Sequence, residues 1–187
     1  DLYQRPISPY LTRIFLRAGF SANAVTAVMI LIGWAAAASL LIPGLPGGVL
    51  AAVLGQLQML IDATDGEVAR WRQTMSPTGV FLDKIAHYST EAFIAIALGV
   101  RAAGGFDANS GWTLVGALLA VVLLLNKSLN DFVHVARAYA GLPRVSESAA
   151  IAAPRPGMIA TARRIARFVP FHKLFHSIEM TLLALAA

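Results

Sequence analysis

Three aspartates and one histidine are the residues of this sequence whose types and spacing point to chemistry. Asp62 and Asp65 lie in the stretch LIDATDGEVAR, and Asp83 and His87 lie in GVFLDKIAHY. At about 100° per residue, each pair falls on one side of a helix. A short connection joins the two helices, so we expect these sides to meet. Carboxylates crowded together in a low dielectric repel each other unless a cation compensates, and oxygen ligands favour Mg²⁺ or Mn²⁺.

Small residues beside the aspartates leave space between the two expected helices. Gly66 and Ala69 share the side of the first two aspartates, with Arg70 at its edge, and Gly79 shares the side of Asp83. A leucine at any of these small positions would fill the space that a ligand needs. Close packing of helices through small residues is the alternative interpretation of each glycine. Their combination with the aspartates favours a ligand pocket.

The chain that must position these residues is strongly apolar. It has 187 residues, of which 57% are hydrophobic and 13% charged, with a mean hydropathy of +0.66. Soluble domains carry about 25% charged residues, and several apolar runs here approach the roughly 20 residues that a bilayer requires. We therefore predict a membrane protein rather than a soluble protein with a large helical core. The absence of cysteine excludes disulfides and cysteine-based metal sites.

We predict an all-α fold, a polytopic membrane helical bundle that forms a single domain over residues 1–187. Residues 1–20 have the pattern of an amphipathic interfacial helix, with a short soluble helix as the alternative. A cytoplasmic loop and a basic surface helix are expected over residues 142–168. Five membrane spans are expected, at about residues 23–42, 49–72, 79–100 and 112–139, with the fifth beginning near residue 171.

The distribution of lysine and arginine predicts the orientation of the bundle. Of the 15 lysines and arginines, all except Arg101 and Lys127 lie in the N-terminal segment, around the junction of the second and third spans, or in residues 137–173. Positive charge stays on the cytoplasmic side, so we expect a multi-pass protein of a bacterial cell membrane with its aspartates near the cytoplasmic face. The basic composition then reflects anionic lipids or a phosphate substrate, since no nucleic-acid-binding motif is present.

The spacing of the charged residues also resembles a known signature. Residues 62–87 follow the pattern D-x2-D-G-x2-A-R-x8-G-x3-D-x3-H. This pattern resembles the signature of the CDP-alcohol phosphatidyltransferase family, D-x2-D-G-x2-A-R-x8-G-x3-D-x3-D, with His87 in place of the last aspartate. The stretch SANAVT resembles the P-N-x-x-T segment of that family, with Ala22 where proline is usual. The family usually has six spans, so we expect a further span beyond the five counted here.

The resemblance implies a reaction and its cofactors. Members of this family transfer a substituted phosphoryl group from a CDP-linked alcohol to a second alcohol, with release of CMP, in phospholipid biosynthesis. By resemblance, Asp62, Asp65 and Asp83 would bind two divalent ions, Mg²⁺ or Mn²⁺. The substrates would be CDP-diacylglycerol or another CDP-alcohol and an acceptor alcohol, and the protein would form a homodimer. The resemblance also implies that the following residues contact the CDP group: Gly66, Ala69, Arg70, Gly79, Asn23 and Thr26.

His87 is the position where this sequence departs from the signature. In the family, the last aspartate is the general base for the acceptor hydroxyl and a ligand of the second metal. A histidine could still accept a proton near neutral pH, and Glu91, one turn further on, could hold the other ring nitrogen. Imidazole is a poorer Mg²⁺ ligand than carboxylate, so we expect weaker binding of the second metal or a preference for Mn²⁺. The alternative is a structural histidine in a weakened enzyme.

The fourth expected span also carries polar residues. Lys127 and Asp131 lie one turn apart, so they either form an ion pair with each other or act at the acceptor site. Arg137 could hold an anionic acceptor or a lipid phosphate, or it could belong to a basic rim that faces anionic lipids.

Two other classes of membrane protein use intramembrane carboxylates. Membrane prenyltransferases bind Mg²⁺-diphosphate through two Asp-rich clusters on separate helix pairs, whereas both clusters here lie on consecutive spans. A divalent-cation transporter would need acidic residues that continue toward the outer face, where the second and third spans are apolar. The sequence therefore favours the transferase. It names neither the acceptor alcohol nor the CDP-alcohol.

Overall fold

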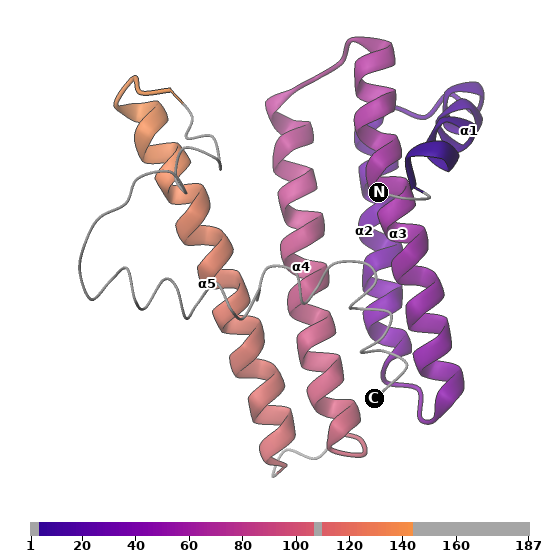
Figure 1. Cartoon of the computed structure of the whole chain (residues 1–187), viewed down its shortest axis with the longest axis vertical. Coiled ribbons are helices and arrows are strands. Elements are labelled where there is room, and N and C mark those ends of the chain that lie inside the picture. Colours follow the sequence, from indigo (N-terminus) through magenta and orange to yellow (C-terminus); the bar gives the residue numbers. More distant parts are fainter. Residues whose placement is uncertain (1–3, 107–109, 144–187) are drawn as a thin grey trace.

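The computed structural model describes residues 4–106 and 110–143, and every regular element in these ranges is an α-helix. The described elements are α1 (Gln4–Arg17), α2 (Ala22–Ser39), α3 (Leu45–Arg72), α4 (Pro77–Ala102) and α5 (Gly111–Tyr139). The all-α helical fold predicted from the sequence is confirmed (Figure 1). The expected fifth span lies outside the described residues, and so does the expected surface helix with all but the first two residues of its loop.

Three of the described helices, α2, α3 and α5, are long and apolar enough to cross a membrane. α4 was also expected to be a span, and its 26 residues are sufficient in length. It does not reach the same apolar composition because its first half carries charged side chains among its polar residues. The charged residues of α4 therefore need partners on the neighbouring helices.

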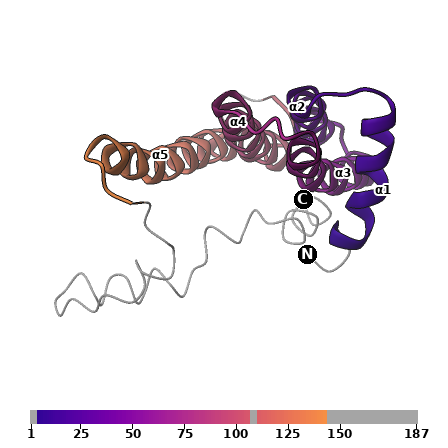
Figure 2. The ribbon, with the colours of Figure 1, turned by 90° about the horizontal axis from the view of Figure 1, so that it is seen from above.

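α2 packs against both α3 and α4, and α5 contacts the bundle through α4 (Figure 1). The axis of α5 leans away from α2 and α3. Seen from above, α1 lies across the direction of the other helices and covers the edge formed by α3 (Figure 2). The core between these helices includes the buried side chains of Val25, Met29, Ile61, Val68 and Ala86.

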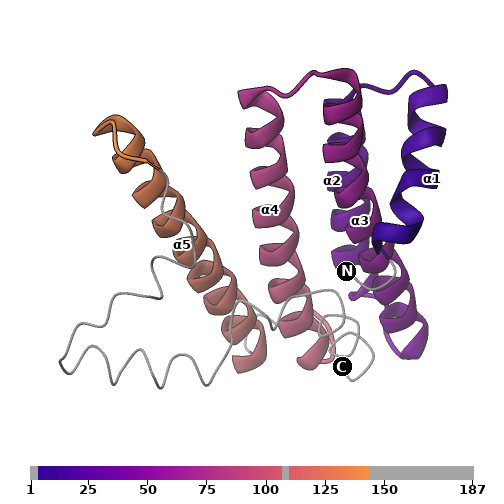
Figure 3. The ribbon, with the colours of Figure 1, turned by 45° about the horizontal axis from the view of Figure 1, so that its top comes forward.

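A short turn connects α3 to α4 at one end of the bundle (Figure 3). α3 ends at Gln73, which adopts a left-handed conformation with φ of 53° and donates its N–H to the last turn of the helix. α4 begins at Ser76, whose hydroxyl accepts from the Gly79 N–H at 3.1 Å, and Pro77 follows in the first turn. The C-terminal end of α3 and the N-terminal end of α4 therefore lie at the same end of the bundle, where side chains from the two helices meet.

Glycine residues allow α4 and α5 to approach closely at the opposite end. A Cβ atom added at Gly99 would lie 2.8 Å from the Gly116 Cα and 2.7 Å from the Trp112 carbonyl oxygen. A Cβ at Gly116 would lie 2.7 Å from the Ala95 carbonyl oxygen. Small residues are used in this way where membrane helices pack backbone against backbone. This contact fixes one end of the α4–α5 pair.

Arg101, which departs from the predicted distribution of positive charge, binds the turn between α2 and α3. Its guanidinium donates to the carbonyl oxygens of Leu40 at 3.1 Å, Ile42 at 2.8 Å and Gly44 at 2.7 Å. Leu40 directly follows α2, and Ile42 and Gly44 belong to the turn that leads into α3, where carbonyl groups have no helical partner. Arg101 therefore has a structural role at this end of the bundle.

Candidate active site

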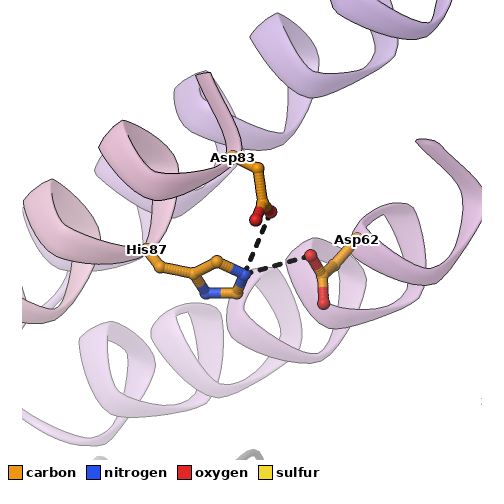
Figure 4. Close-up of side chains that lie close together, drawn as sticks. All are labelled: Asp62, Asp83 and His87. Carbon is orange, nitrogen blue, oxygen red and sulfur yellow. Dashed lines mark hydrogen bonds and ion pairs between the residues drawn. The ribbon is translucent and has the colours of Figure 1, made fainter. Parts of the chain in front are cut away.

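The side chains of His87, Asp62 and Asp83 converge between α3 and α4 (Figure 4), and this group does not include Asp65, which the sequence also predicted there. The His87 Nε2 atom lies 3.1 Å from Asp62 Oδ1 and 3.4 Å from Asp83 Oδ1. One potential ligand atom from each of the three residues lies within 4.8 Å of the others. The imidazole nitrogen therefore faces two carboxylates that come from different helices.

The three side chains remain accessible to a ligand. The exposed fractions are 29% for Asp62, 31% for His87 and 40% for Asp83. Full burial of two carboxylates without a cation would carry a large desolvation cost. Partial exposure lowers that cost and leaves a route for a charged substrate or ion.

Asp65 lies near this group but has a different partner. Its Oδ2 accepts a hydrogen bond of 2.8 Å from the Thr26 hydroxyl on α2. Thr26 also lies 3.1 Å from the carbonyl oxygen of Ala22, so its single proton can serve one acceptor at a time. The family resemblance implies that Thr26 contacts the CDP group, which remains a prediction, and in the structure its hydroxyl binds the second aspartate of the signature.

The small residues of the signature have different surroundings. At Gly79, an added Cβ would lie 3.4 Å from Asn23 Oδ1, so α2 and α4 meet there through a side-chain amide. At Gly66, an added Cβ would lie 3.3 Å from Arg70 Nη1, so the exposed guanidinium folds back over its own helix. Ala69 packs against the buried core cluster, which favours a packing role for this residue.

The prediction that Glu91 holds the second nitrogen of His87 is wrong. Glu91 Oε1 accepts from Lys127 Nζ at 2.7 Å, on the side of α4 that faces α5. Glu91 is four residues from His87, but a rotation of about 40° around the helix separates them. In this structure that rotation is enough to direct the carboxylate to a different neighbouring helix.

The predicted ion pair between Lys127 and Asp131 is also replaced by contacts to α4. Lys84 Nζ lies 2.9 Å from Asp131 Oδ1, and Tyr88 donates its hydroxyl proton to the other oxygen of Asp131. The Lys127 ammonium group binds Glu91 and lies 5.2 Å from the centre of the Tyr88 ring. Each charge of this α4–α5 cluster thus has an opposite partner on the other helix.

The structure places Arg137 at the end of α5, away from any described carboxylate partner. Its Nε donates to the carbonyl oxygen of Pro143 at 2.9 Å, which ties the chain that leaves α5 back to the helix. Its proposed role toward an anionic acceptor or lipid phosphate remains a prediction.

Sequence reasoning missed Glu67, which lies within the signature on α3. Its two carboxylate oxygens accept from Ser8 at 2.6 Å and from Thr12 at 2.5 Å, both on α1. The available signal was a pair of hydroxyl residues at helical spacing on the face of α1 that packs inward.

The donor set suits a divalent cation. Two carboxylate oxygens and one imidazole nitrogen, from Asp62, Asp83 and His87, can approach a common point, and no described lysine or arginine forms an ion pair with them. Carboxylate ligands suit Mg²⁺ and Mn²⁺, and an imidazole ligand shifts the preference toward transition metals. The hydrogen bond to Thr26 holds Asp65 beside this group, from where it could complete a second ion site.

The chain is similar to a known protein family. A family model described as CDP-alcohol phosphatidyltransferase matches residues 20–171, which include the whole signature together with α2 to α5. α1 precedes the matched range. No curated protein matches the chain.

Proposed function

The chain belongs to the CDP-alcohol phosphatidyltransferase family, and we propose that it transfers a phosphatidyl-type phosphoryl group from a CDP-alcohol to an acceptor alcohol, releasing CMP, in phospholipid biosynthesis. The observation that carries this proposal is the meeting of Asp62, Asp83 and His87 at signature positions between α3 and α4. A diphosphate substrate needs such a place, where its negative charge can be neutralised near a group that accepts a proton.

The reaction exchanges one phosphorus–oxygen bond for another. The acceptor oxygen forms a bond to the phosphorus, the bond from phosphorus to the CMP oxygen breaks, and CMP leaves with that electron pair. The acceptor hydroxyl loses its proton, which His87 takes at a ring nitrogen in this proposal. Asp62, Asp65 and Asp83 would hold divalent ions, which would supply charge neutralisation for the diphosphate and for the departing CMP.

The protein residues contribute position and polarity around these groups. Thr26 fixes the rotamer of Asp65 through its hydrogen bond. The guanidinium of Arg70 lies over Gly66 at the exposed side of α3, where it can bind a substrate phosphate. Asn23 lies beside Gly79, close to the start of α4, where its amide can bind the nucleotide.

We propose Mn²⁺ as a better cofactor than Mg²⁺, because His87 replaces a carboxylate with a nitrogen ligand. The positive charges near the α3–α4 turn support an active site that opens to the cytoplasm. Homodimer formation and a bacterial cell membrane remain proposals, the first drawn from the family resemblance alone. A membrane prenyltransferase and a cation transporter are both less consistent with the family match than a transferase is.

Purified protein in detergent tests the reaction directly. CMP release is measured with CDP-diacylglycerol, with Mg²⁺ or Mn²⁺, and with a panel of acceptor alcohols. The proposal requires CMP formation that depends on both metal and acceptor and that is lost in Asp62→Asn. The matched control is Asp107→Asn, which makes the same chemical change between α4 and α5 in the sequence and should retain activity. Metal-dependent CDP binding without CMP release from any acceptor would contradict the proposed chemistry.

A further inference from the structure

A carboxylate on the active-site helix α3 binds two hydroxyl groups of α1. Glu67 accepts a hydrogen bond on each oxygen, from Ser8 at 2.6 Å and from Thr12 at 2.5 Å. Ser8 is fully buried and Thr12 is 8% exposed, so water cannot readily replace either donor. Hydrogen bonds to a charged acceptor are stronger than those between neutral groups. Loss of either hydroxyl would leave part of this carboxylate without a partner.

Glu67 lies between two signature residues on the same helical stretch. Asp65 is two residues before it and Arg70 is three residues after it. Leu11 and Phe15 of α1 pack against the same core cluster as Ala69, which extends the contact along α3. A shift of α1 relative to the bundle would therefore act on the turn of α3 that carries the proposed metal and phosphate contacts.

An apolar stripe on the other side of α1 faces away from the protein. Ile7, Tyr10 and Ile14 are 45%, 74% and 61% exposed, and their spacing places them on one side of the helix. Arg13 and Arg17 are exposed along the edge of this stripe. α1 also lies across the direction of the bundle helices, as a helix at a bilayer surface does (Figure 2). An apolar stripe beside cations is complementary to the surface of an anionic bilayer.

We propose that α1 is a membrane-bound positioning element for the active site, and that Glu67 is the positioning residue through which it acts. The occupant of the Ile7–Tyr10–Ile14 stripe is the anionic lipid surface. Seating of α1 on this surface holds the Asp65–Arg70 turn of α3 in its working position, which makes substrate binding depend on the lipid composition. This inference rests on the proposed function for its activity readout, and α1 lies outside the range that the family match covers.

The position of α1 can be measured without any enzyme activity. The native chain lacks cysteine, so Ile14→Cys carries a single nitroxide label in protein reconstituted in nanodiscs. We expect the label to be shielded from a water-soluble relaxation agent in discs of equimolar phosphatidylcholine and phosphatidylglycerol. A label at Thr74→Cys, in the exposed α3–α4 turn, is the control and should stay accessible. Equal accessibility at both positions would overturn the lipid assignment.

The dependence of substrate binding on the lipid surface is measured as a ratio. This ratio is the KM for the CDP-alcohol in neutral nanodiscs divided by that in anionic nanodiscs. We expect a wild-type KM that is about fivefold lower in anionic discs, with kcat changed little. Thr12→Val removes one donor at nearly constant volume and should bring the ratio close to one, whereas Thr12→Ser keeps the hydroxyl and should retain the wild-type ratio. Glu67→Gln should behave like Thr12→Val, because its amide keeps only one acceptor oxygen.

Two controls separate this inference from its premises. Thermal unfolding identifies any variant that has lost its fold, and the Thr12→Val and Thr12→Ser pair then still tests the hydrogen bond. If the protein releases no CMP, the proposed function fails by itself. The dependence on lipid is then measured as the ratio of the Mn²⁺ affinities in anionic and in neutral nanodiscs, determined by electron paramagnetic resonance. Ratios that stay at the wild-type value in both Thr12→Val and Glu67→Gln would overturn the role of Glu67.

Discussion

α4 carries charged side chains toward α3 and toward α5, and the two groups differ in charge balance. Toward α5, Lys84 and Glu91 pair with Asp131 and Lys127, so two cations face two carboxylates. Toward α3, Asp83 and His87 face Asp62 without any lysine or arginine partner in the described residues. Both groups are half-buried on the same stretch of helix. The charges of the group toward α5 balance each other, whereas the group toward α3 has an excess of negative charge.

This difference indicates which group is built for a ligand. Ion pairs that cross a helix interface offset their desolvation when each charge has a partner. Carboxylates that share a site without a cation raise the free energy of the folded protein, and a bound cation removes that cost. The group between α3 and α4 therefore favours a cation from solution, and the α4–α5 cluster holds the two helices together.

The largest effect is expected from Asp62→Asn. This change removes one negative charge from the group between α3 and α4. We expect CMP release to fall by about 10²- to 10³-fold. The unfolding temperature should change little in the absence of metal, because the lost contact with His87 is offset by lower repulsion. CMP assays and thermal unfolding of the same preparation check both statements. A large loss of thermal stability would mean that Asp62 is a structural residue.

The next effect concerns the α4–α5 cluster. Lys127→Met leaves Glu91 without its partner, and we expect a loss of about 1–2 kcal/mol in the free energy of unfolding, since the pair is only partly buried. The double variant Lys127→Met with Glu91→Gln should recover most of that loss, because no unpaired charge remains. Unfolding in denaturant, in detergent, measures all three proteins. A double variant less stable than the single variant would show that the pair is not the source of the effect.

His87→Asp restores the charge of the family signature. A third carboxylate beside Asp62 and Asp83 should raise the affinity for Mg²⁺ by about tenfold, because binding strength follows the charge and type of the ligands. The preference for Mn²⁺ should fall at the same time. Calorimetric titration with each ion is the measurement, and His134→Asp on α5 is the control for an added carboxylate elsewhere. Unchanged metal affinities would assign His87 no role in metal binding.

The smallest effect is expected from Asp65→Asn without metal. The amide oxygen can still accept from Thr26, while one negative charge leaves the crowded group. We expect the metal-free protein to become more stable by about 0.5 kcal/mol, whereas stabilisation by added Mn²⁺ should decrease. The matching change on the other side of α4, Asp131→Asn, should lower stability because Lys84 loses its partner. Changes of the same sign in both variants would remove the distinction between the two groups.

The sequence was sufficient to predict the helices and the meeting of side chains from α3 and α4. Long apolar runs end at polar turns, and helical periodicity places Asp62, Asp83 and His87 on sides that a short turn brings together. It was not sufficient to predict which neighbour each remaining polar residue contacts. Glu91 could face His87 or α5, and the choice depends on the rotation of α4, which the sequence pattern of one helix does not determine.

Contacts between elements far apart in sequence were missed for a related reason. The bond from Thr26 to Asp65 joins α2 to α3, and the bonds to Glu67 join α1 to α3. Each depends on the crossing angle and depth of two helices, which are set by the packing of the whole bundle. The sequence shows only that hydroxyl and acidic residues occur within apolar helix faces. It does not show which of them form hydrogen bonds with each other.

The contact between Gly99 and Gly116 has a consequence for the genetics of this protein. Every codon for glycine is surrounded by single-base changes that are either silent, nonsense or encode a residue with a Cβ atom. At these two positions a Cβ would overlap the backbone of the facing helix, and overpacking of this kind costs about 1–3 kcal/mol. Neither position therefore has a neutral missense neighbour, and a deep mutational scan should register both as intolerant even though they lie at the opposite end of α4 from the candidate active site.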